Sequence, residues 1–341
     1  MRLTSLCFIG AVHTKVPPIL HYDQRRKIST IRWVCASLEI NTQPPVILRL
    51  AAIDIGSNAA RLLISEVSIG ADGKAEFNKL NLIRVPLRLG FDVFEKGEIG
   101  KEKIGMVLQT MKAYKHLLNA YQVQHLKACA TSAMRDARNS ADLIRKVKME
   151  TGIDIEVITG GFEAALIYEN HIAENMSADS SYLYIDVGGG STELTFFAKG
   201  KLVFKESINI GTIRLLKDQV TESNWDGMKE FLRKSTKGYP NIVAIGSGGN
   251  INKIFSISKK KDGRPLHIDL LRDYYKEFSS VNLEERIRIY KLREDRADVI
   301  VPALLIYINV MRWAEAKEIY VPKIGLADGL VQHLWEEVKG V

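Results

Sequence analysis

The hydrophobic positions of residues 48–341 follow two different periods. Apolar runs too short for helices, over Leu48–Ile55, 61–67 and 126–130, are typical of buried strands. Residues 101–121 instead carry apolar side chains every three or four positions, which predicts an amphipathic helix with one buried face. Strands and helices continue to alternate toward the C-terminus. The sequence therefore predicts an α/β protein.

The later elements follow from the same two patterns. We predict helices over 140–148, 162–174, 213–218 and 225–234, and strands over 153–159, 182–185, 242–245 and 318–321. The longest apolar run, 299–308, contains Pro302 and is followed by Asn309, so it falls well short of the roughly 20 residues that a membrane span requires. We expect it to be a buried helix, and we expect no membrane partner.

The first 45 residues differ in composition from the rest of the chain. They contain two Pro-Pro pairs, no sustained hydrophobic period, and six Lys/Arg against two Asp/Glu, so that +4 of the formal charge of +8 lies there. The remaining excess is too small to indicate a nucleic-acid partner. We expect 1–45 to be a disordered extension, 46–160 to form a first domain that the C-terminal helix 326–341 rejoins, and 161–325 to form a second.

The three cysteines, Cys7, Cys35 and Cys129, are odd in number and lack the spacing of a metal or redox site. This number and spacing favour reduced thiols in a cytoplasmic protein.

Chemistry concentrates in a stretch that joins a buried strand to a glycine-rich turn. Asp186 ends the strand, and the turn that follows contains Gly188, Gly189, Gly190, Ser191 and Thr192. Successive amides in such a turn form an anion cradle, and a carboxylate beside it can hold the Mg²⁺ that accompanies a polyphosphate. The turn has no Lys and leads into a strand, unlike a Walker loop or a dinucleotide-binding fingerprint.

This stretch has an internal repeat 132 residues earlier, counted from Ile53 to Ile185. There, Asp54 is followed by the small-residue turn Gly56, Ser57 and Asn58 and by a returning strand. Two such hairpins facing each other would put two carboxylates and two amide cradles around one metal polyphosphate. Either copy alone could equally be a tight turn with a capping acid. A third turn, with Gly246, Ser247 and Gly248, leads into a helix; it could approach a phosphate or simply allow close strand–helix packing.

Five segments together resemble the exopolyphosphatase and guanosine pentaphosphate phosphohydrolase (Ppx/GppA) family. They are AIDIGSNAARLLI, ATSAMRDARN, VITGGFEAALIY, IDVGGGSTEL and AIGSGGNI. The resemblance implies the fold of the actin, Hsp70 and sugar-kinase superfamily, with two ribonuclease-H-like domains and an active-site cleft between them. It also implies Mg²⁺- or Mn²⁺-dependent removal of the terminal phosphate from polyphosphate or from a guanosine penta- or tetraphosphate nucleotide.

The resemblance also implies roles for particular residues. Glu163 is similar to the family's water-activating glutamate, and Arg135 to an arginine that contacts substrate phosphate. Without the resemblance, Glu163 could simply be an acid in the first turn of a helix, and Arg135 an exposed charge on a helix. Asp54, Asp186 and Glu193 are the implied metal ligands. The implied phosphate-binding residues are Gly56, Ser57, Asn58, Gly188, Gly189, Gly190, Ser191, Thr192, Gly246, Ser247 and Gly248.

The sequence departs from the family pattern at four positions. Ala59 replaces a hydroxyl, Phe162 an acid, and Ala165 and Ala327 each an arginine. These changes concern substrate preference more than reaction type. The sequence has no adjacent His-Asp pair, which would indicate the metal phosphohydrolase domain of longer family members. We therefore expect the short, two-domain form. A homodimer is a possible assembly. Two alternatives stay open: an acceptor-dependent kinase of the same fold, and a non-catalytic sensor of polyphosphate or pppGpp.

Overall fold

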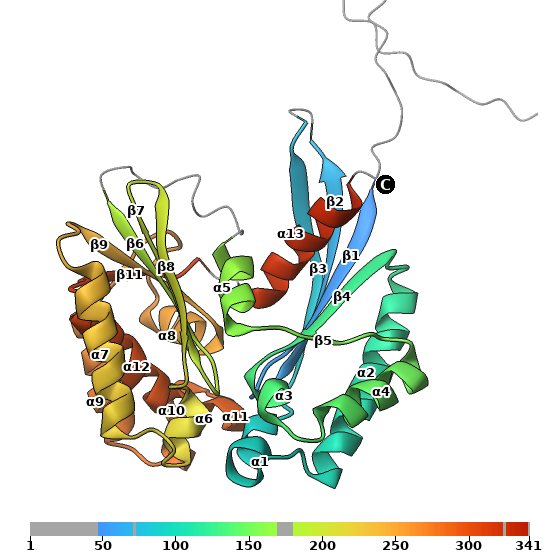
Figure 1. Ribbon diagram of the computed structural model, residues 1–341, viewed down its shortest axis with the longest axis horizontal. Coiled ribbons are helices and arrows are strands. Elements are labelled where there is room, and N and C mark those ends of the chain that lie inside the picture. The colour runs from blue at the N-terminus through green and yellow to red at the C-terminus, as the bar shows by residue number, and fades with distance from the viewer. Residues whose placement is uncertain (1–46, 71–72, 169–179, 323–324, 340–341) are drawn as a thin grey trace, which may run out of the picture. The chain divides into compact units, whose positions relative to one another are not determined.

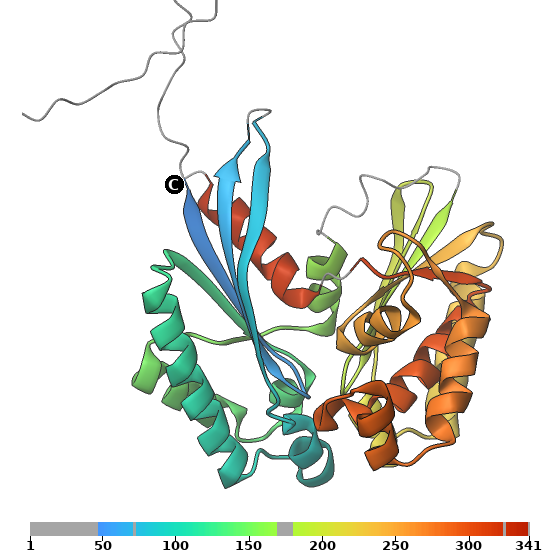
Figure 2. The same cartoon turned by 180° about the vertical axis from the view of Figure 1, so that it is seen from behind.

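The computed structural model describes residues 47–70, 73–168, 180–322 and 325–339. The extension predicted to be disordered, 1–45, lies outside these ranges, as does the second half of the helix predicted over 162–174. Pro45–Val341 forms one compact unit. Its described residues contain two β-sheets, each flanked by helices (Figures 1 and 2).

The first sheet has the strand order β3-β2-β1-β4-β5. Its antiparallel part is β1 (Leu48–Ile55), β2 (Ala60–Ile69) and β3 (Ala75–Val85). On the other side of β1, the sheet continues with β4 (His125–Ala130) and β5 (Glu156–Val157), which both run parallel to β1.

The second sheet has the order β10-β11-β9-β6-β7-β8. Its antiparallel part is β6 (Ser181–Val187), β7 (Thr192–Ala198) and β8 (Lys201–Ile208). The strands β9 (Ile242–Ser247) and β11 (Glu318–Tyr320) run parallel to β6, and β10 (Leu266–His267) closes the edge. Both sheets thus begin with a three-stranded antiparallel meander. On its other side, the first strand of each meander pairs with a parallel strand. The internal sequence repeat occupies the same place in each sheet, the turn from the first strand to the second.

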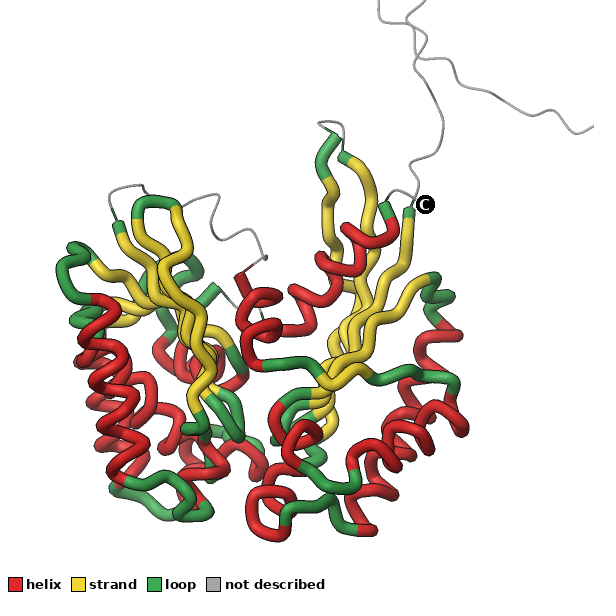
Figure 3. Tube along the Cα trace, viewed as in Figure 1, coloured by secondary structure: helices red, strands yellow, loops and turns green. Residues whose placement is uncertain are grey.

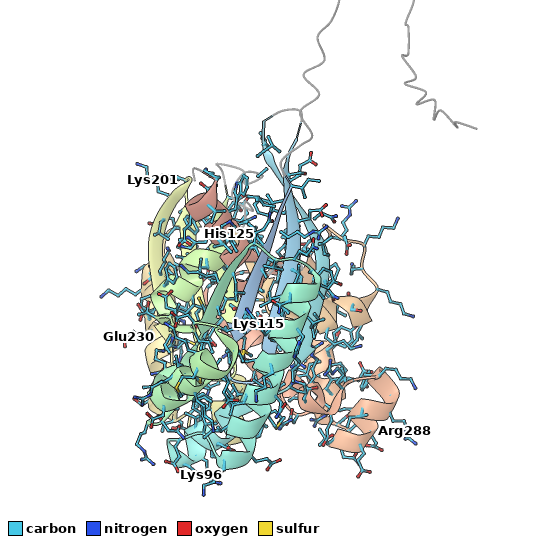
Figure 4. All side chains as sticks on the ribbon, turned by 90° about the vertical axis from the view of Figure 1, so that its right-hand side faces the viewer. Lys96, Lys115, His125, Lys201, Glu230 and Arg288 are labelled. Atoms are coloured by element: carbon cyan, nitrogen blue, oxygen red, sulfur yellow. The ribbon has the colours of Figure 1, made fainter. Side chains whose placement is uncertain are left out.

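The helices bury opposite faces of the first sheet. Alternate residues of β1 divide between two apolar clusters: Ile53 and Ile55 belong to one, and Leu50 and Ala52 to the other. The first cluster includes the buried side of α2 (Lys101–Ala120) and α4 (Ser140–Thr151). The second includes α13 (Leu326–Val338) and α5 (Gly160–Tyr168). In Figure 4, Lys115 projects from the opposite, exposed side of α2.

Three long helices cover one face of the second sheet, as Figures 1 and 3 show. They are α7 (Glu222–Thr236), α9 (Ile268–Ser279) and α12 (Ile300–Trp313), and they share one apolar cluster with Leu183 and Ile185 of β6. The remaining helices are α1 (Leu89–Lys96), α3 (Ser132–Asp136), α6 (Thr212–Leu216), α8 (Gly249–Ser258), α10 (Leu283–Tyr290) and α11 (Glu294–Ala297).

Helix α12 confirms the predicted buried helix. Pro302 lies in its first turn, where a missing N–H removes no intrahelical hydrogen bond. In the described part of the chain, no helix combines the length and apolar character that crossing a membrane needs.

One predicted strand was wrong in extent. The strand predicted over 153–159 is reduced to Glu156 and Val157, because only Cys129 and Ala130 of β4 pair with it. Ile153, Ile155 and Ile158 are nonetheless buried, whereas Val157 is exposed, so the segment contributes to the core without a long ladder of hydrogen bonds. Helix α1 was not predicted.

The thiol of Cys129 is fully buried and unpaired, and burial raises its pKa to about 12. The reactive thiolate is therefore scarce near neutral pH. We expect iodoacetamide at pH 8 to alkylate Cys129 at least about 100-fold more slowly in the native protein than in denaturant. Mass spectrometry of the peptide containing Cys129 measures both rates, and equal rates would contradict this environment.

Candidate functional site

The two repeated turns are closed by equivalent backbone hydrogen bonds. The amide of Gly56 donates to the carbonyl of Ala59 at 3.0 Å, and the amide of Gly188 donates to the carbonyl of Ser191 at 2.9 Å. Each turn connects antiparallel strands, β1 to β2 and β6 to β7. The structure therefore confirms that the repeat seen in the sequence is a repeat of local structure.

The two turns also lie against each other. A Cβ added to Gly189 would lie 2.8 Å from the Cβ of Ser57, so no larger residue fits there without displacement of a turn. The hydroxyl of Ser57 is 2.8 Å from that of Ser132, at the start of α3. This packing closes the base of the site with backbone and small side chains.

The third glycine-rich turn approaches the acid at the end of β6. Gly248 has φ of 100°, and an added Cβ would lie 2.7 Å from Oδ1 of Asp186. Both the positive φ and the close approach require glycine. Tyr307 of α12 donates its hydroxyl to the carbonyl of Ser247 at 2.6 Å and so fixes the turn from behind. The three predicted turns therefore meet around Asp186 and Ser57.

A cavity of about 270 Å³ opens between these turns. The predicted residues that line it are Asp54, Gly56, Ser57, Asn58, Glu163, Asp186, Gly188, Gly189, Ser191 and Gly248. The predicted residues Arg135, Gly190, Thr192, Glu193, Gly246 and Ser247 are not among its lining, and they lie in the same turns and strands or behind them.

Three carboxylates gather beside this cavity. Glu163, Asp186 and Glu193 each place an oxygen within 4.8 Å of the others, and within the described ranges they form the cluster suited to a metal ion. Oε1 of Glu193 accepts hydrogen bonds from the hydroxyls of Ser191 (2.6 Å) and Ser207 (3.0 Å). Oε2 of Glu193 and Oε2 of Glu163 are buried without a hydrogen-bond partner.

The environment disfavours the charged form of these acids. Burial, followed by the neighbouring charge of Asp186, raises the pKa of Glu193 to about 7. Burial also raises the pKa of Glu163 well above its ordinary value, and the charges of Glu193 and Asp186 add to this. A set of clustered carboxylates with unpartnered oxygens offers what a hard divalent cation such as Mg²⁺ or Mn²⁺ binds.

Asp54 has a different environment from the one expected of a metal ligand. Its carboxylate is 2% exposed and pairs with Arg61 of β2 at 2.5 Å. The acid cluster therefore joins Asp186 and Glu193 with Glu163, while Asp54 lies in the cavity wall with its own counter-ion.

Arg135 of α3 donates from Nη1 to the carbonyl of Ile158 at 2.7 Å. Ile158 precedes the start of α5 by two residues, so this bond fixes the segment that carries Glu163. The positive charge of Arg135 also opposes the rise in the pKa of both Glu163 and Glu193.

The sequence reasoning missed four cationic residues of the cavity wall: Arg61, Lys79, Arg84 and Arg296. Lys79 owes its orientation to a bulge in β3. Ile64 pairs with Asn81 and Ser65 with Lys79, so one residue is extra and Lys79 faces the cavity together with Arg84. No local motif marks these residues. A register irregularity of this kind has no clear signature in a single sequence.

Comparison with known proteins is consistent with this geometry. The family model of the Ppx/GppA phosphatase family matches residues 68–337. A Ppx/GppA family member from Aquifex aeolicus has a similar structure, with a TM-score of 0.66 and 29% identity over 86% of this chain and 99% of that one. These findings confirm the predicted fold of two α/β domains of the actin, Hsp70 and sugar-kinase type. The chain belongs to the Ppx/GppA phosphatase family.

Two relatives have names that state an activity. "Exopolyphosphatase 2" of Mycobacterium tuberculosis is 33% identical over 174 residues, 49% of this chain. "Guanosine-5'-triphosphate,3'-diphosphate pyrophosphatase" of Vibrio vulnificus is 25% identical over 303 residues, 85% of this chain. The chain spans 53% of the length of the first relative and 60% of the second.

The raised pKa of Glu193 predicts a dependence of stability on pH. A folded-state pKa above the ordinary 4.5 means that the folded protein holds this proton more tightly, so stability is lost as pH rises from 4.5 through about 7. Gln cannot ionise. In EDTA, we expect Glu193→Gln to increase the free energy of unfolding at pH 8 by up to about 3 kcal/mol and to change it little at pH 5.

Urea denaturation at the two pH values measures this difference. The matched control is Glu206→Gln, since Glu206 is exposed on the neighbouring strand β8 and should show no such pH-dependent gain. If Glu193→Gln is no more stable than the wild type at pH 8, the charge of Glu193 does not destabilise the folded protein.

Proposed function

We propose that this protein is a divalent-cation-dependent phosphohydrolase that removes the terminal phosphate from inorganic polyphosphate, from pppGpp, or from both. One observation carries the proposal. The buried carboxylate of Glu163 lines a cavity bounded by glycine-rich turns, has one oxygen without a partner, and places an oxygen within 4.8 Å of the acids Asp186 and Glu193. The names of two relatives, an exopolyphosphatase and a pppGpp-cleaving enzyme, support the substrate class.

The glycine-rich turns are the proposed phosphate cradle. The residues of these turns that line the cavity include Gly56, Ser57, Asn58, Gly188 and Ser191. Backbone amides of the two turns are the proposed donors to the phosphates. Oriented amides of this kind bind anions without the desolvation cost of burying a further cation. We assign Gly190, Thr192, Gly246, Ser247 and Gly248 to the support of this cradle.

Asp186 and Glu193 are the proposed ligands of Mg²⁺ or Mn²⁺. Asp54 is paired with Arg61, so we propose that it contacts the ion only through water. Such an ion, when bound, would neutralise charge on the phosphates and on the neighbouring carboxylates. The carboxylate oxygens of Asp186 and Glu193 are hard donors that suit either ion.

Glu163 is the proposed general base. Its raised pKa suits a group that accepts a proton near neutral pH, provided that positive charge in the cavity keeps it ionised in the working state. A water oxygen attacks the terminal phosphorus in line as its proton passes to Glu163, and the bond from phosphorus to the bridging oxygen breaks. Arg135 supports this step by holding the segment before α5 through Ile158, with its charge near Glu163.

We also propose the boundaries of the two domains, 46–160 with the C-terminal helix 326–341, and 161–325. The packing of α13 against β1 supports this assignment of the C-terminal helix. The cavity draws residues from both parts, including Asp54 of β1 and Asp186 of β6.

Replacement of the proposed base tests the mechanism directly. We expect Glu163→Gln to retain the fold and to lower the rate of phosphate release by about 10² to 10⁴, the range typical of general-base catalysis. Glu156→Gln is the matched control, because Glu156 is an exposed acid seven residues earlier in the chain. Near wild-type turnover by folded Glu163→Gln would remove Glu163 from this role.

Substrate preference requires a comparison of purified protein on long polyphosphate, short polyphosphate, pppGpp and ATP, each with Mg²⁺ or EDTA. We expect phosphate release from at least one of the first three substrates without an added acceptor, and its loss in EDTA. Transfer only when an acceptor is present would indicate a kinase. Tight binding of polyphosphate or pppGpp with no turnover would indicate a sensor.

A further inference from the structure

Ser207 lies in a row of directly paired residues that crosses three strands. Asp186 of β6 pairs with Glu193 of β7, and Glu193 pairs with Ser207 of β8. Directly opposite residues place their side chains on the same face of a sheet, close enough to interact. The row therefore continues from two proposed metal ligands to a serine that neither the sequence motifs nor the proposed mechanism uses.

The hydroxyl of Ser207 orients the carboxylate of Glu193. It donates to Oε1 at 3.0 Å, and Ser191 donates to the same oxygen at 2.6 Å. With both donors on Oε1, the other oxygen, Oε2, remains buried and without a partner. The two hydroxyls thus fix which oxygen of Glu193 is available to its neighbours.

Ser207 also contacts the start of the helix that carries Glu163. A Cβ added to Gly160 would lie 2.3 Å from Oγ of Ser207 and 3.7 Å from Oε1 of Glu193. Residues three apart in a helix share a face, so the side of α5 that rests on Ser207 is the side that presents Glu163. The backbone of Gly160 can approach this closely because glycine has no side chain.

We propose that Ser207 is a positioning residue that sets the spacing between Glu193 and Glu163. Its hydroxyl turns Glu193 toward the acid cluster, and its contact with Gly160 fixes the distance of α5 from β7. This inference rests on the proposed function, because it concerns the ability of the cluster to hold a divalent cation. Groups that orient a metal ligand typically change metal affinity or activity by 10- to 100-fold when they are removed.

The experiment measures Mn²⁺ binding by electron paramagnetic resonance, with no substrate present, and phosphate release at saturating Mn²⁺. We expect Ser207→Ala to weaken Mn²⁺ binding about 10-fold. The matched control is Ser181→Ala, since Ser181 is another serine of this sheet but lies at the opposite end of β6 from Asp186. It should bind Mn²⁺ as the wild type does.

A second pair of variants tests the spacing while the hydroxyl is kept. We expect Gly160→Ala to lower phosphate release by about 10-fold or more, because its methyl group must displace Ser207 or α5. Gly161→Ala is the control on the same turn, where an added Cβ meets no atom within 4 Å. Thermal unfolding of all four variants separates this effect from loss of the fold.

The outcomes distinguish the inference from the function on which it rests. If the wild type binds Mn²⁺ and releases phosphate while Ser207→Ala and Gly160→Ala match it in both assays, Ser207 has no positioning role. If the wild type itself neither binds Mn²⁺ nor releases phosphate, the proposed function fails and the inference falls with it. Weakened Mn²⁺ binding by Ser207→Ala, with an unchanged Ser181→Ala control, supports the assignment.

Discussion

The repulsion among three clustered carboxylates, two of them buried, is the constraint on which the site depends. Each acid that loses contact with water favours its neutral form, and the proximity of Asp186 to Glu193 and Glu163 increases this preference. A fold selected only for stability would place an apolar or paired group there. The structure instead leaves one oxygen of Glu163 and one of Glu193 without a partner. The cluster is therefore poised to take up positive charge, either as protons or as a cation.

The glycines make this arrangement geometrically possible. The acids can lie close to the two turns because Gly189 and Gly248 let backbone approach Ser57 and Asp186 at distances that a side chain would prevent. The surrounding sheets hold the turns rigidly, since each turn joins strands that are hydrogen-bonded along their length. The apolar clusters on both faces of each sheet provide the stability that the acid cluster lacks.

The sequence predicted the parts of this structure that depend on local pattern. Strand burial and turn chemistry are local properties, so β1, β6 and their two turns could be found, and the repeat between them indicated the duplicated sheet. Partners distant in sequence could not be found in this way. The pairing of Arg61 with Asp54 and the orientation of Lys79 depend on strand register, and the bulge in β3 that sets this register leaves no clear sequence signature. For the same reason, the serine on β8 that contacts Glu193 had no visible role.

The charge of the cavity wall bears on how a polyanion could bind. Within the described structure, four cations line it, Arg61, Lys79, Arg84 and Arg296, against four acids, Asp54, Glu163, Asp186 and Asp328. Three of these cations already have carboxylate partners, in the pairs Arg61–Asp54, Lys79–Asp328 and Arg84–Asp295. An incoming phosphate chain must therefore share or displace those partners, so the net charge of +8 is a poor measure of affinity at this cavity. Neutral amides of the turns and a cation at the acid cluster avoid that competition, because neither is committed to an ion pair within the protein.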